Sequence, residues 1–534
     1  MANKFYLTTP IYYVNAPPHL GHAYTNVISD VIARYHRQKG DATFFLTGTD
    51  EHGAKNMRAA QAAGKTPQEF VDQQVELFKQ LNNKLGISND DFIRTSDQKR
   101  HWPGAQALWG RLAAAGDIYK ASYRGLYCVG HEAFVTEKDL VDGMCEEHGK
   151  APEVIEEENY FFKLSRYASE IERVLTSGEL AIFPESRKNE ILSFIREGVM
   201  DVSFSRPSKD IPWGVPVPGD ASQTMYVWCD ALPNYMTALG FGAGDLQKFD
   251  QFWPADLHVM GKDILRFHAL IWPGMLLSAK LPLPRSLLVH GHILSGGKKM
   301  SKTLGNVVDP FDLIERYGAE AVRSYFARDI SPFEDGDFTY EKFEESYQAN
   351  LANGLGNLTR RISTMIKTYF GGKIEKPDAA LLEKVPLKRD IGVLGFSHSI
   401  AEEKVEYVSL SYFAEHIIFP EYTERMEKFE VSRGAEAVFR LVREADGYIQ
   451  DYEPFKLVKT DQEQTKAVLW NAAFALAAVA HMLTPFLPEG AAKIAEILGI
   501  EGQKPFSWGA FTGKDHEPLF PRLTKKDRAP AEVK

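Results

Sequence analysis

The sequence contains little cysteine, no membrane-length apolar run and no excess of positive charge. Three cysteines among 534 residues argue against a disulfide framework. The apolar run at residues 472–480 is too short to cross a membrane and is expected to form a core helix. The first residues, Met-Ala-Asn-Lys-Phe-Tyr, lack the apolar segment of a signal peptide. We therefore expect a cytoplasmic protein with no membrane partner.

The formal net charge is −10, whereas proteins that bind nucleic acid are usually basic. This objection to a nucleic-acid partner is weak, because phosphate contacts need only local basic patches. The chain has 44% hydrophobic and 25% charged residues, as in ordinary globular proteins. Its length allows several domains with large cores.

The first chemical pattern lies near the N-terminus. A β-rich run at residues 5–9 leads into a loop with three prolines, and His19-Leu-Gly-His22 opens a helix that continues to about Gln38. The N–H groups and dipole of a helix start attract phosphate. Gly21 has no Cβ, so a nucleobase can approach its backbone, and both imidazoles can donate to phosphate oxygens. The same residues also suit an ordinary polar helix start.

A second pattern follows a β-like run at residues 286–294. Residues 296–303 read Gly-Gly-Lys-Lys-Met-Ser-Lys-Thr. Lysine is a flexible point charge suited to phosphate, so this loop can close over a triphosphate. A solvated basic loop is the simpler interpretation of a lone lysine cluster.

Together, residues 19–22 and 299–303 resemble the HIGH and KMSKS signatures of class I aminoacyl-tRNA synthetases. The resemblance implies ATP with Mg²⁺ as a ligand and a Rossmann-like, doubly wound parallel sheet. The residues it implies for catalysis are His19, His22, Lys299 and Lys302. The residues it implies for ATP binding are His19, Gly21, His22, Lys299, Ser301 and Lys302.

Residues 42–53 are typical of a buried strand that ends in a glycine turn with acidic residues. Ligands bind at the carboxyl ends of strands in open parallel sheets. Asp50 can bind an ammonium group there, or it can serve as a turn or cap residue. The resemblance implies that Asp50 receives the α-ammonium group of an amino acid.

Two Cys-x-x-His pairs are close in the chain. Cys128-Val-Gly-His131 and Cys145-Glu-Glu-His148 are separated by thirteen residues. Two such pairs on neighbouring turns build a tetrahedral zinc site, although incidental cysteines near histidines give the same pattern. The resemblance places them in the family's connective insertion, where members often have cysteine at position 131 and some have lost the metal.

Residues 47–53, the two Cys-x-x-His pairs and the segments 228–235 and 261–268 narrow the resemblance to the methionyl-tRNA synthetases. Any single aromatic residue in them suits an ordinary core, but a thioether also makes favourable contacts with aromatic faces. His268 or Tyr13 would add a polar contact to sulfur, a weak acceptor. The residues implied for methionine binding are Ile11, Tyr13, Asp50, Trp228, Ala231, Leu232, Tyr235, Ile264, Phe267, His268 and Trp272.

From about Thr339 onward the pattern is helical without βα alternation, which predicts an all-α domain. Asn357 and Arg361, four apart, face the same side of one helix and suit base edges, though a solvated polar face is the simpler interpretation. The resemblance makes both residues anticodon readers. Phe455 stands near where the family often has a stacking tryptophan, and phenylalanine also stacks on bases.

The expected fold is α/β: the doubly wound sheet with an inserted zinc-knuckle connective domain, followed by an all-α anticodon-binding helix bundle. The two catalytic halves are residues 1–117 and 223–290, with the insertion at 118–222 between them. The other expected regions are a lysine-loop and stem-contact region (291–345), the helical domain (346–510) and a C-terminal tail (511–534), which is expected to be frayed from Gly513 onward.

The resemblance implies formation of methionyl-adenylate from ATP, then transfer to the 2′-hydroxyl of the tRNA terminal adenosine. The expected partners are L-methionine, ATP and tRNA(Met), with the initiator first and the elongator as a further candidate, and the chain is expected to be a monomer. Three alternatives stay open. These are another class I synthetase, a nucleotidyltransferase acting on a small cofactor, and a catalytically silent synthetase-like RNA-binding protein.

Overall fold

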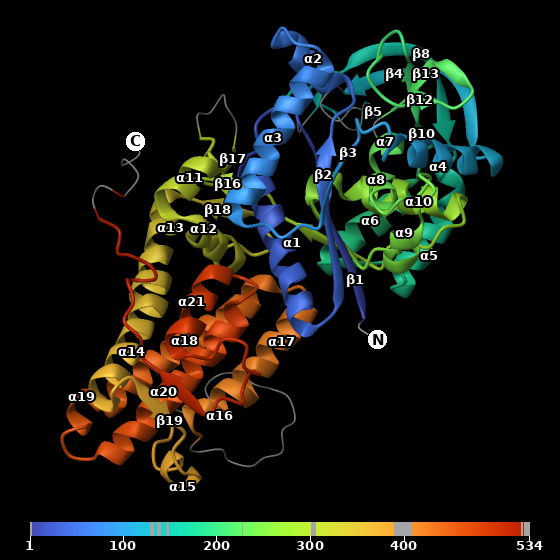
Figure 1. Cartoon of the computed structure of the whole chain (residues 1–534). Helices are drawn as coiled ribbons and strands as arrows, with labels where there is room; N and C mark the ends of the chain where they lie inside the picture. The colour runs from blue at the N-terminus through green and yellow to red at the C-terminus, as the bar shows by residue number, and fades with distance from the viewer. Residues whose placement is uncertain are drawn as a thin grey trace. The chain divides into compact units, whose positions relative to one another are not determined.

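The computed structural model describes residues 3–128, 133–135, 140–145, 149–226, 228–300, 306–388, 408–524 and 527. The chain forms two compact units. The first contains Met1–His292, Val308–Pro310 and Phe333–Asp335. The second contains Ile293–Val307, Phe311–Pro332 and Gly336–Lys534. Figure 1 traces the chain through both units.

The first unit is built on a six-stranded parallel sheet in the order β3-β2-β1-β14-β15-β9. Its strands are β1 (Lys4–Tyr13), β2 (Ala42–Asp50), β3 (Asp91–Arg94), β9 (Ala181–Phe183), β14 (Leu257–Gly261) and β15 (Ser286–His290). The strand order reverses between β1 and β14, so a topological switch point lies there. The predicted parallel sheet is confirmed.

Helices cover both faces of this sheet. Figure 1 shows α1 (Leu20–Lys39) and α3 (Pro67–Leu85) on one side of β1, β2 and β3, and α8 (Asn234–Thr237) and α10 (Trp272–Ser278) on the other. The second face packs on a large core that includes Tyr6 and Leu46 of the strands. The remaining helices of the unit are α2 (Ala54–Ala62), α4 (Trp102–Ala114), η2 (Leu164–Tyr167), α5 (Ala168–Ser177), α6 (Glu185–Glu197), α7 (Trp228–Ala231), α8 (Asn234–Thr237), α9 (Gln247–Phe252), η3 (Lys262–Ile264), η4 (Phe267–Ile271) and α10 (Trp272–Ser278).

Strand β1 is longer than the sequence predicted. It continues past Thr9 to Tyr13, with a register shift between Thr8 and Ile11. Pro10 lies inside this shift and cannot donate a ladder hydrogen bond, which is why proline in a strand is tolerated at an irregularity. Beyond it, Tyr13 pairs with Asp50 of β2. The extension therefore brings two predicted methionine-site residues side by side.

Smaller sheets lie between β3 and β14 in the chain. Their strands are β4 (Ile118–Cys128), β5 (Ala133–Val135), β6 (Leu140–Val141), β7 (Met144–Cys145), β8 (Glu153–Phe162), β10 (Val202–Ser203), β11 (Ser205–Pro207), β12 (Pro216–Val217) and β13 (Asp220–Met225). The antiparallel orders are β10-β8-β4-β5, β11-β13-β12 and β6-β7. Short strands at both ends of residues 205–217 pair with β13.

The second unit is mainly helical, as predicted. Its helices are α11 (Pro310–Tyr317, which starts in the first unit), α12 (Ala319–Ser324), η6 (Tyr325–Asp329), α13 (Tyr340–Ser346), η7 (Tyr347–Gly356), α14 (Asn357–Phe370), α15 (Ala379–Leu382), α16 (Leu410–Tyr412), η9 (Phe413–Ile418), α17 (Phe419–Glu427), α18 (Val431–Tyr452), α19 (Pro454–Leu457), α20 (Gln462–Leu483) and α21 (Pro488–Leu498). Its strands are β16 (Ile293–Ser295), β17 (Lys298–Lys299), β18 (Gly336–Phe338), β19 (Lys373–Glu375) and β20 (Ala510–Thr512).

Three details of these elements bear on the sequence predictions. The expected single strand at residues 286–294 is two strands, β15 and β16, in different sheets. Gly291 lies at the break, where a Cβ would stand 2.1 Å from the Glu334 carbonyl oxygen. Helix α20 is the one helix among the described residues that is long and apolar enough to cross a membrane, and 89% of its apolar window is buried in the protein. That burial fits the predicted core helix.

The C-terminal tail was predicted to be frayed, which is wrong for its first part. The Gly513 amide donates to the Gly372 carbonyl at 3.0 Å, and Phe520 is buried. The Tyr347 hydroxyl donates a hydrogen bond of 2.7 Å to the Pro521 carbonyl. The segment was predicted to be frayed because most of its residues are charged, but a few apolar residues hold it against the protein.

Candidate functional site

Two histidines cap helix α1 beside the switch point. His19 is the N-cap residue, and its Nδ1 accepts from the Gly21 amide at 3.0 Å. The His19 amide donates in turn to Nδ1 of His22 at 3.1 Å, and the two rings stack with centroids 3.8 Å apart. Because both Nδ1 atoms accept, each neutral ring carries its proton on Nε2. The cap therefore yields two imidazole N–H donors at one helix start, as the sequence predicted for a phosphate site.

The surroundings keep these rings neutral. Burial lowers the pKa of His22 well below its usual range, and the neighbouring His19 lowers it further. The protein atoms around His19 also lower the pKa of that ring, although it keeps an exposed edge. Tyr12 packs against His22 at 4.7 Å between ring centroids and donates to Asn26 at 2.8 Å. The His22 ring is therefore held from β1 and from its own helix.

A carboxylate that was absent from the predicted site lies at the end of β14. Asp263 follows Gly261 on η3, and its Oδ1 is 3.7 Å from Nε2 of His292. Desolvation opposes its charge, but contact with His292 holds the pKa of Asp263 below its usual range. The charge of Asp263 also acts on His19. An acceptor thus stands across the switch point from the two donors.

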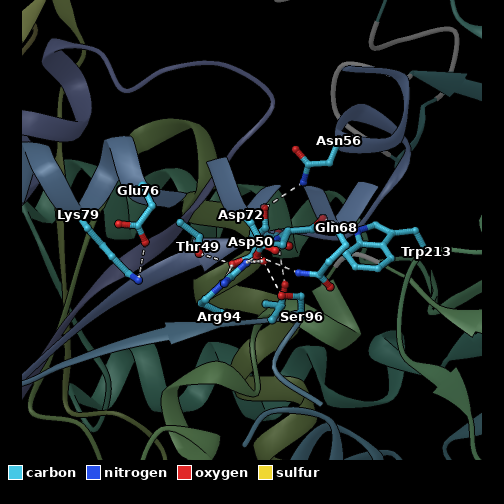
Figure 2. A network of polar contacts seen from close by, with 12 residues as sticks. Thr49, Asp50, Asn56, Gln68, Asp72, Glu76, Lys79, Arg94, Ser96 and Trp213 are labelled. Carbon is cyan, nitrogen blue, oxygen red and sulfur yellow. Dashed lines mark hydrogen bonds and ion pairs between the residues drawn. The ribbon is translucent and has the colours of Figure 1, made fainter. Parts of the chain in front are cut away.

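The turn after β2 is fixed by a buried polar network (Figure 2). Glu51 has no exposed surface and binds the Arg94 guanidinium through both carboxylate oxygens at 2.7 Å. The Thr49 hydroxyl donates to Oε1 of Glu51 at 2.7 Å, and the Ser96 hydroxyl donates to Oε2 at 2.5 Å. Charge-assisted bidentate pairs of this kind are among the stronger hydrogen bonds. The network sets the backbone on either side of Asp50.

Asp50 is buried at the end of β2, with 5% of its surface exposed. Asn56 spans the following turn, because its side-chain amide donates to the carbonyls of Asp50 at 3.0 Å and His52 at 2.9 Å. Burial, and then the charge of Asp50 among nearby groups, raises the pKa of Tyr235. The charge of the predicted ammonium ligand therefore reaches a predicted pocket residue.

The predicted methionine residues form an aromatic group. Trp228 and Phe267 stack with ring centroids 3.5 Å apart, and Trp228 also packs in a small cluster with Tyr13. Ala231, Leu232, Tyr235, His268 and Trp272 are buried. Ile11, Ile264 and Phe267 pack at the edge of the same core. Among the side chains that the sequence assigned to methionine, the structure stacks Trp228 on Phe267 and buries most of the others. Their role in binding methionine stays a prediction.

Histidine 268 differs from its expected role. Burial lowers its pKa to about 4, so the ring is neutral at pH 7. Its Nδ1 is 3.0 Å from the Ile264 carbonyl, which requires a proton on Nδ1, and its Nε2 then accepts from the Tyr235 hydroxyl at 2.6 Å. Neither ring nitrogen has a hydrogen left for sulfur. The expected polar contact from His268 is therefore unavailable in this arrangement, and the ring instead orients Tyr235.

In α7, which also contains Trp228, one buried carboxylate joins two histidines. Asp230 Oδ2 is 2.6 Å from Nδ1 of His52, and its Oδ1 is 2.9 Å from Nε2 of His101. Burial disfavours the charge, yet His52 and then His101 bring the pKa of Asp230 down to about 2. Sequence reasoning missed all three residues, because 178 positions separate His52 from Asp230 and no local pattern links them.

Several predicted site residues cannot be placed. Ser301 and Lys302 of the lysine loop lie outside the described residues, and Lys299 is described only by its backbone in β17, opposite Leu294 of β16. His131 and His148 also lie outside them, while Cys128 and Cys145 are buried and form no disulfide. In the described ranges, no group of three or more metal-ligating side chains gathers.

The predicted anticodon residues lie on the helical unit. Asn357 and Arg361 are half-buried in α14, and Nη1 of Arg361 forms an ion pair with Asp446 of α18. Phe455, in α19, exposes 44% of its surface. An exposed phenylalanine is available to stack on a base.

Comparison with known proteins gives consistent matches along the chain. A family model described as tRNA synthetases class I (M) matches residues 5–148 and 135–363, and one described as the anticodon binding domain of methionyl tRNA ligase matches residues 412–514. The methionine–tRNA ligase of Streptomyces coelicolor is 41% identical, covering 99% of this chain and 98% of the relative. The methionine–tRNA ligase of Thermotoga maritima is 39% identical, covering 98% of this chain and 81% of the relative.

The fold matches solved structures of the same kind. Methionyl-tRNA synthetase of Mycobacterium tuberculosis in complex with methionyl-adenylate aligns with a TM-score of 0.87 and 35% identity. The alignment covers 97% of this chain and all of that one. The apo form of that protein aligns with a TM-score of 0.81 and 32% identity, covering 98% of this chain and 99% of that one.

Proposed function

The chain belongs to the methionyl-tRNA synthetases of class I, and from this premise we propose which of its residues carry each part of the reaction. The enzyme activates methionine with ATP to methionyl-adenylate and transfers the methionyl group to tRNA. Activation is an in-line attack of the methionine carboxylate on the α-phosphorus, with pyrophosphate leaving. The protein contributes mainly positioning and charge stabilisation.

The nucleotide occupies the switch point between β1 and β14. His19 and His22 each donate an Nε2–H to phosphate oxygens, and the start of α1 adds its N–H groups and dipole. Gly21 leaves room for the base, and the Asp263 carboxylate accepts from ribose hydroxyls, as an acidic residue does in related folds. The support is the reciprocal cap, which fixes both donors before ATP arrives.

The lysine loop completes the ATP site. Lys299 and Lys302 hold the β- and γ-phosphates, and Ser301 donates to a phosphate oxygen. ATP binds as its Mg²⁺ complex, with the cation carried chiefly by phosphates and water. A loop with three lysines and two glycines suits closure over the substrate.

Methionine lies between Asp50 and the aromatic group. Asp50 receives the ammonium, and Trp228, Tyr235, Phe267 and Trp272 surround the thioether, which is polarizable and favours aromatic faces. Ile11, Ala231, Leu232 and Ile264 complete an apolar wall, while His268 orients Tyr235 and Tyr13 lies next to Asp50. The observation that carries this assignment is the pairing of Tyr13 with Asp50 beside the stacked Trp228 and Phe267.

Substituting Asp50 tests the methionine assignment. Asp50→Asn removes the charge but keeps the shape, so the KM for methionine in ATP–pyrophosphate exchange should rise at least tenfold, while the KM for ATP changes less than twofold. An equal rise in both constants would show that Asp50 shapes the whole site rather than binding the ammonium group.

The Cys/His pairs form a structural zinc site in this proposal. Cys128 and Cys145 are buried, and a Cys₂His₂ set with His131 and His148 has the donor chemistry that tetrahedral zinc prefers. Metal analysis of the purified protein should give one zinc per chain. Cys145→Ser should abolish it, and zinc retained in that variant would place the metal elsewhere.

Anticodon reading falls to the helical domain, residues 346–510. Asn357 and Arg361 contact base edges and Phe455 stacks on a base, because amide and guanidinium groups are suited to edge recognition. We further propose that a cytoplasmic monomer charges the initiator tRNA(Met) and also the elongator. Charging assays with the two tRNAs and the sedimentation coefficient of the free protein test these points.

A further inference from the structure

One buried carboxylate joins three segments that are distant in the chain. His52 follows β2, His101 precedes α4, and Asp230 lies within α7. Each oxygen of Asp230 meets one imidazole, at 2.6 Å for His52 and 2.9 Å for His101. These three residues are 4%, 0% and 1% exposed, respectively. We call them the His–Asp–His clamp.

The hydrogen-bond roles inside the clamp are nearly fixed. His101 Nε2 donates to Asp230, also reaching its main-chain carbonyl at 2.9 Å, and Nδ1 of His101 is 3.0 Å from the Thr237 hydroxyl. His52 donates from Nδ1, and among the described residues its buried Nε2 has no hydrogen-bond partner. Losing one donor would leave part of a buried carboxylate unpaired, which is costly in a low-dielectric interior.

The clamp connects the two ends of the methionine site. His52 stands two residues after Asp50, and Asn56 binds both carbonyls of that turn. Asp230 stands between Trp228 and Ala231, so α7 carries both the clamp and the pocket wall. The distance from the ammonium ligand to the apolar wall is thus set through the clamp.

We propose that His52 and Asp230 are positioning residues that set the length of the amino-acid pocket and thereby the preference for methionine over shorter and longer thioethers. This rests on the proposed methionine site, with Asp50 at one end and Trp228 at the other. A pocket wall held in one place discriminates a methylene by about 10–200-fold. A wall that shifts admits both the shorter and the longer thioether, so the site selects methionine less strongly.

The two nitrogens of His52 allow a matched pair of variants. In His52→Asn the side-chain amide lies where Nδ1 was, so a donor to Asp230 is kept. In His52→Gln the amide lies where Nε2 was, so the donor to Asp230 is lost while the side chain keeps a similar size and polarity. Asp256→Asn serves as a control, because Asp256 is also buried (7% exposed) and ion-paired, at 3.0 Å to Lys4, but at the start of β14.

The readout is ATP–pyrophosphate exchange with methionine and with S-methylcysteine and ethionine, each of which differs from methionine by one methylene. His52→Gln should raise the KM for methionine about tenfold, leave the KM for ATP within twofold, and lower the kcat/KM preference for methionine about tenfold. His52→Asn and Asp256→Asn should keep the preference within threefold of the parent. If His52→Gln does not fold, His52→Leu replaces it.

Two results would overturn the proposal. One is an unchanged preference in a folded His52→Gln or His52→Leu protein. The other is an equal rise in the KM for ATP and in the KM for all three amino acids, which indicates a general structural role. Asp50→Asn is measured alongside them. If that variant leaves the KM for methionine unchanged, the methionine site itself is misplaced, and this outcome is distinguishable from failure of the clamp.

Discussion

The His19 amide donates to Nδ1 of His22 at 3.1 Å, so the second histidine of the motif is oriented by the backbone of the first. The bond leaves Nε2 of His22 as a donor. His22 thus has two separable roles: it is an acceptor that caps the helix and, in the proposed ATP site, a donor for phosphate.

The first prediction separates these roles at His22. His22→Asn keeps an acceptor near Nδ1 and loses the donor, so the melting temperature should stay within a few degrees while kcat for adenylate formation falls about 10²–10³-fold. His22→Gln keeps a group near Nε2 and loses the cap, so it should retain more activity and unfold more easily by about 1 kcal/mol. The reverse order of the two variants in exchange kinetics would contradict the assigned donor.

The second prediction concerns the buried charge of Glu51. Arg94→Gln leaves that carboxylate without its bidentate partner and should lower the free energy of unfolding by about 3–5 kcal/mol. Glu51→Gln combined with Arg94→Gln removes both charges and should cost less than Arg94→Gln alone. Urea denaturation of the parent and the variants measures the difference, and equal losses would contradict a stabilising ion pair between Glu51 and Arg94.

The third prediction is a pH dependence from His268. Its pKa is about 4 in the folded protein, against about 6.5 when unfolded. The unfolded chain therefore binds an extra proton as the pH falls below 6.5, and stability is lost from there down to about pH 4. The loss amounts to about 3 kcal/mol at most.

Urea denaturation at pH 7 and pH 5 tests this linkage. His268→Gln keeps an acceptor near Nε2 for Tyr235 and does not titrate. Its stability should fall less between the two pH values than that of the parent. A parallel fall in both proteins would assign the acid sensitivity to other groups.

The fourth prediction separates tRNA reading from activation. Asn357→Ala should leave ATP–pyrophosphate exchange unchanged and reduce kcat/KM for tRNA charging at least tenfold. Lys367→Ala is the matched control on the same helix, because its partner is Asp515. Unchanged charging by Asn357→Ala would remove this residue from the anticodon site.

The local elements were predictable because their signals are local. Helix α1 begins after His19 and ends at Lys39, close to the predicted limits, since apolar spacing, the cap and Gly40 all lie within the segment. Helix α3 has Thr66 and Glu69 in a reciprocal cap, the pattern that predicts its start. The helices of the second unit were predictable for the same reason, because their signals are also local.

The assembled site depended on more than local pattern. Resemblance to a family indicated Trp228 and Phe267, but no spacing in the chain predicts that their rings stack. No local pattern in the sequence singles out Asp263. His52, His101 and Asp230 carry no shared local signal, because the fold alone brings them together. Similarly, the bulge around Pro10 in β1 reflects pairing with β2 and not the propensity of the segment.

The most direct test of the account is ATP–pyrophosphate exchange with each of the twenty amino acids, without tRNA and with Mg²⁺. The switch-point donors, Asp50 and the aromatic pocket predict exchange with methionine and at least a hundredfold lower kcat/KM for any other amino acid. Exchange led by leucine, isoleucine or valine would contradict the pocket assignment. No exchange with any amino acid in a folded sample would contradict activation at this site.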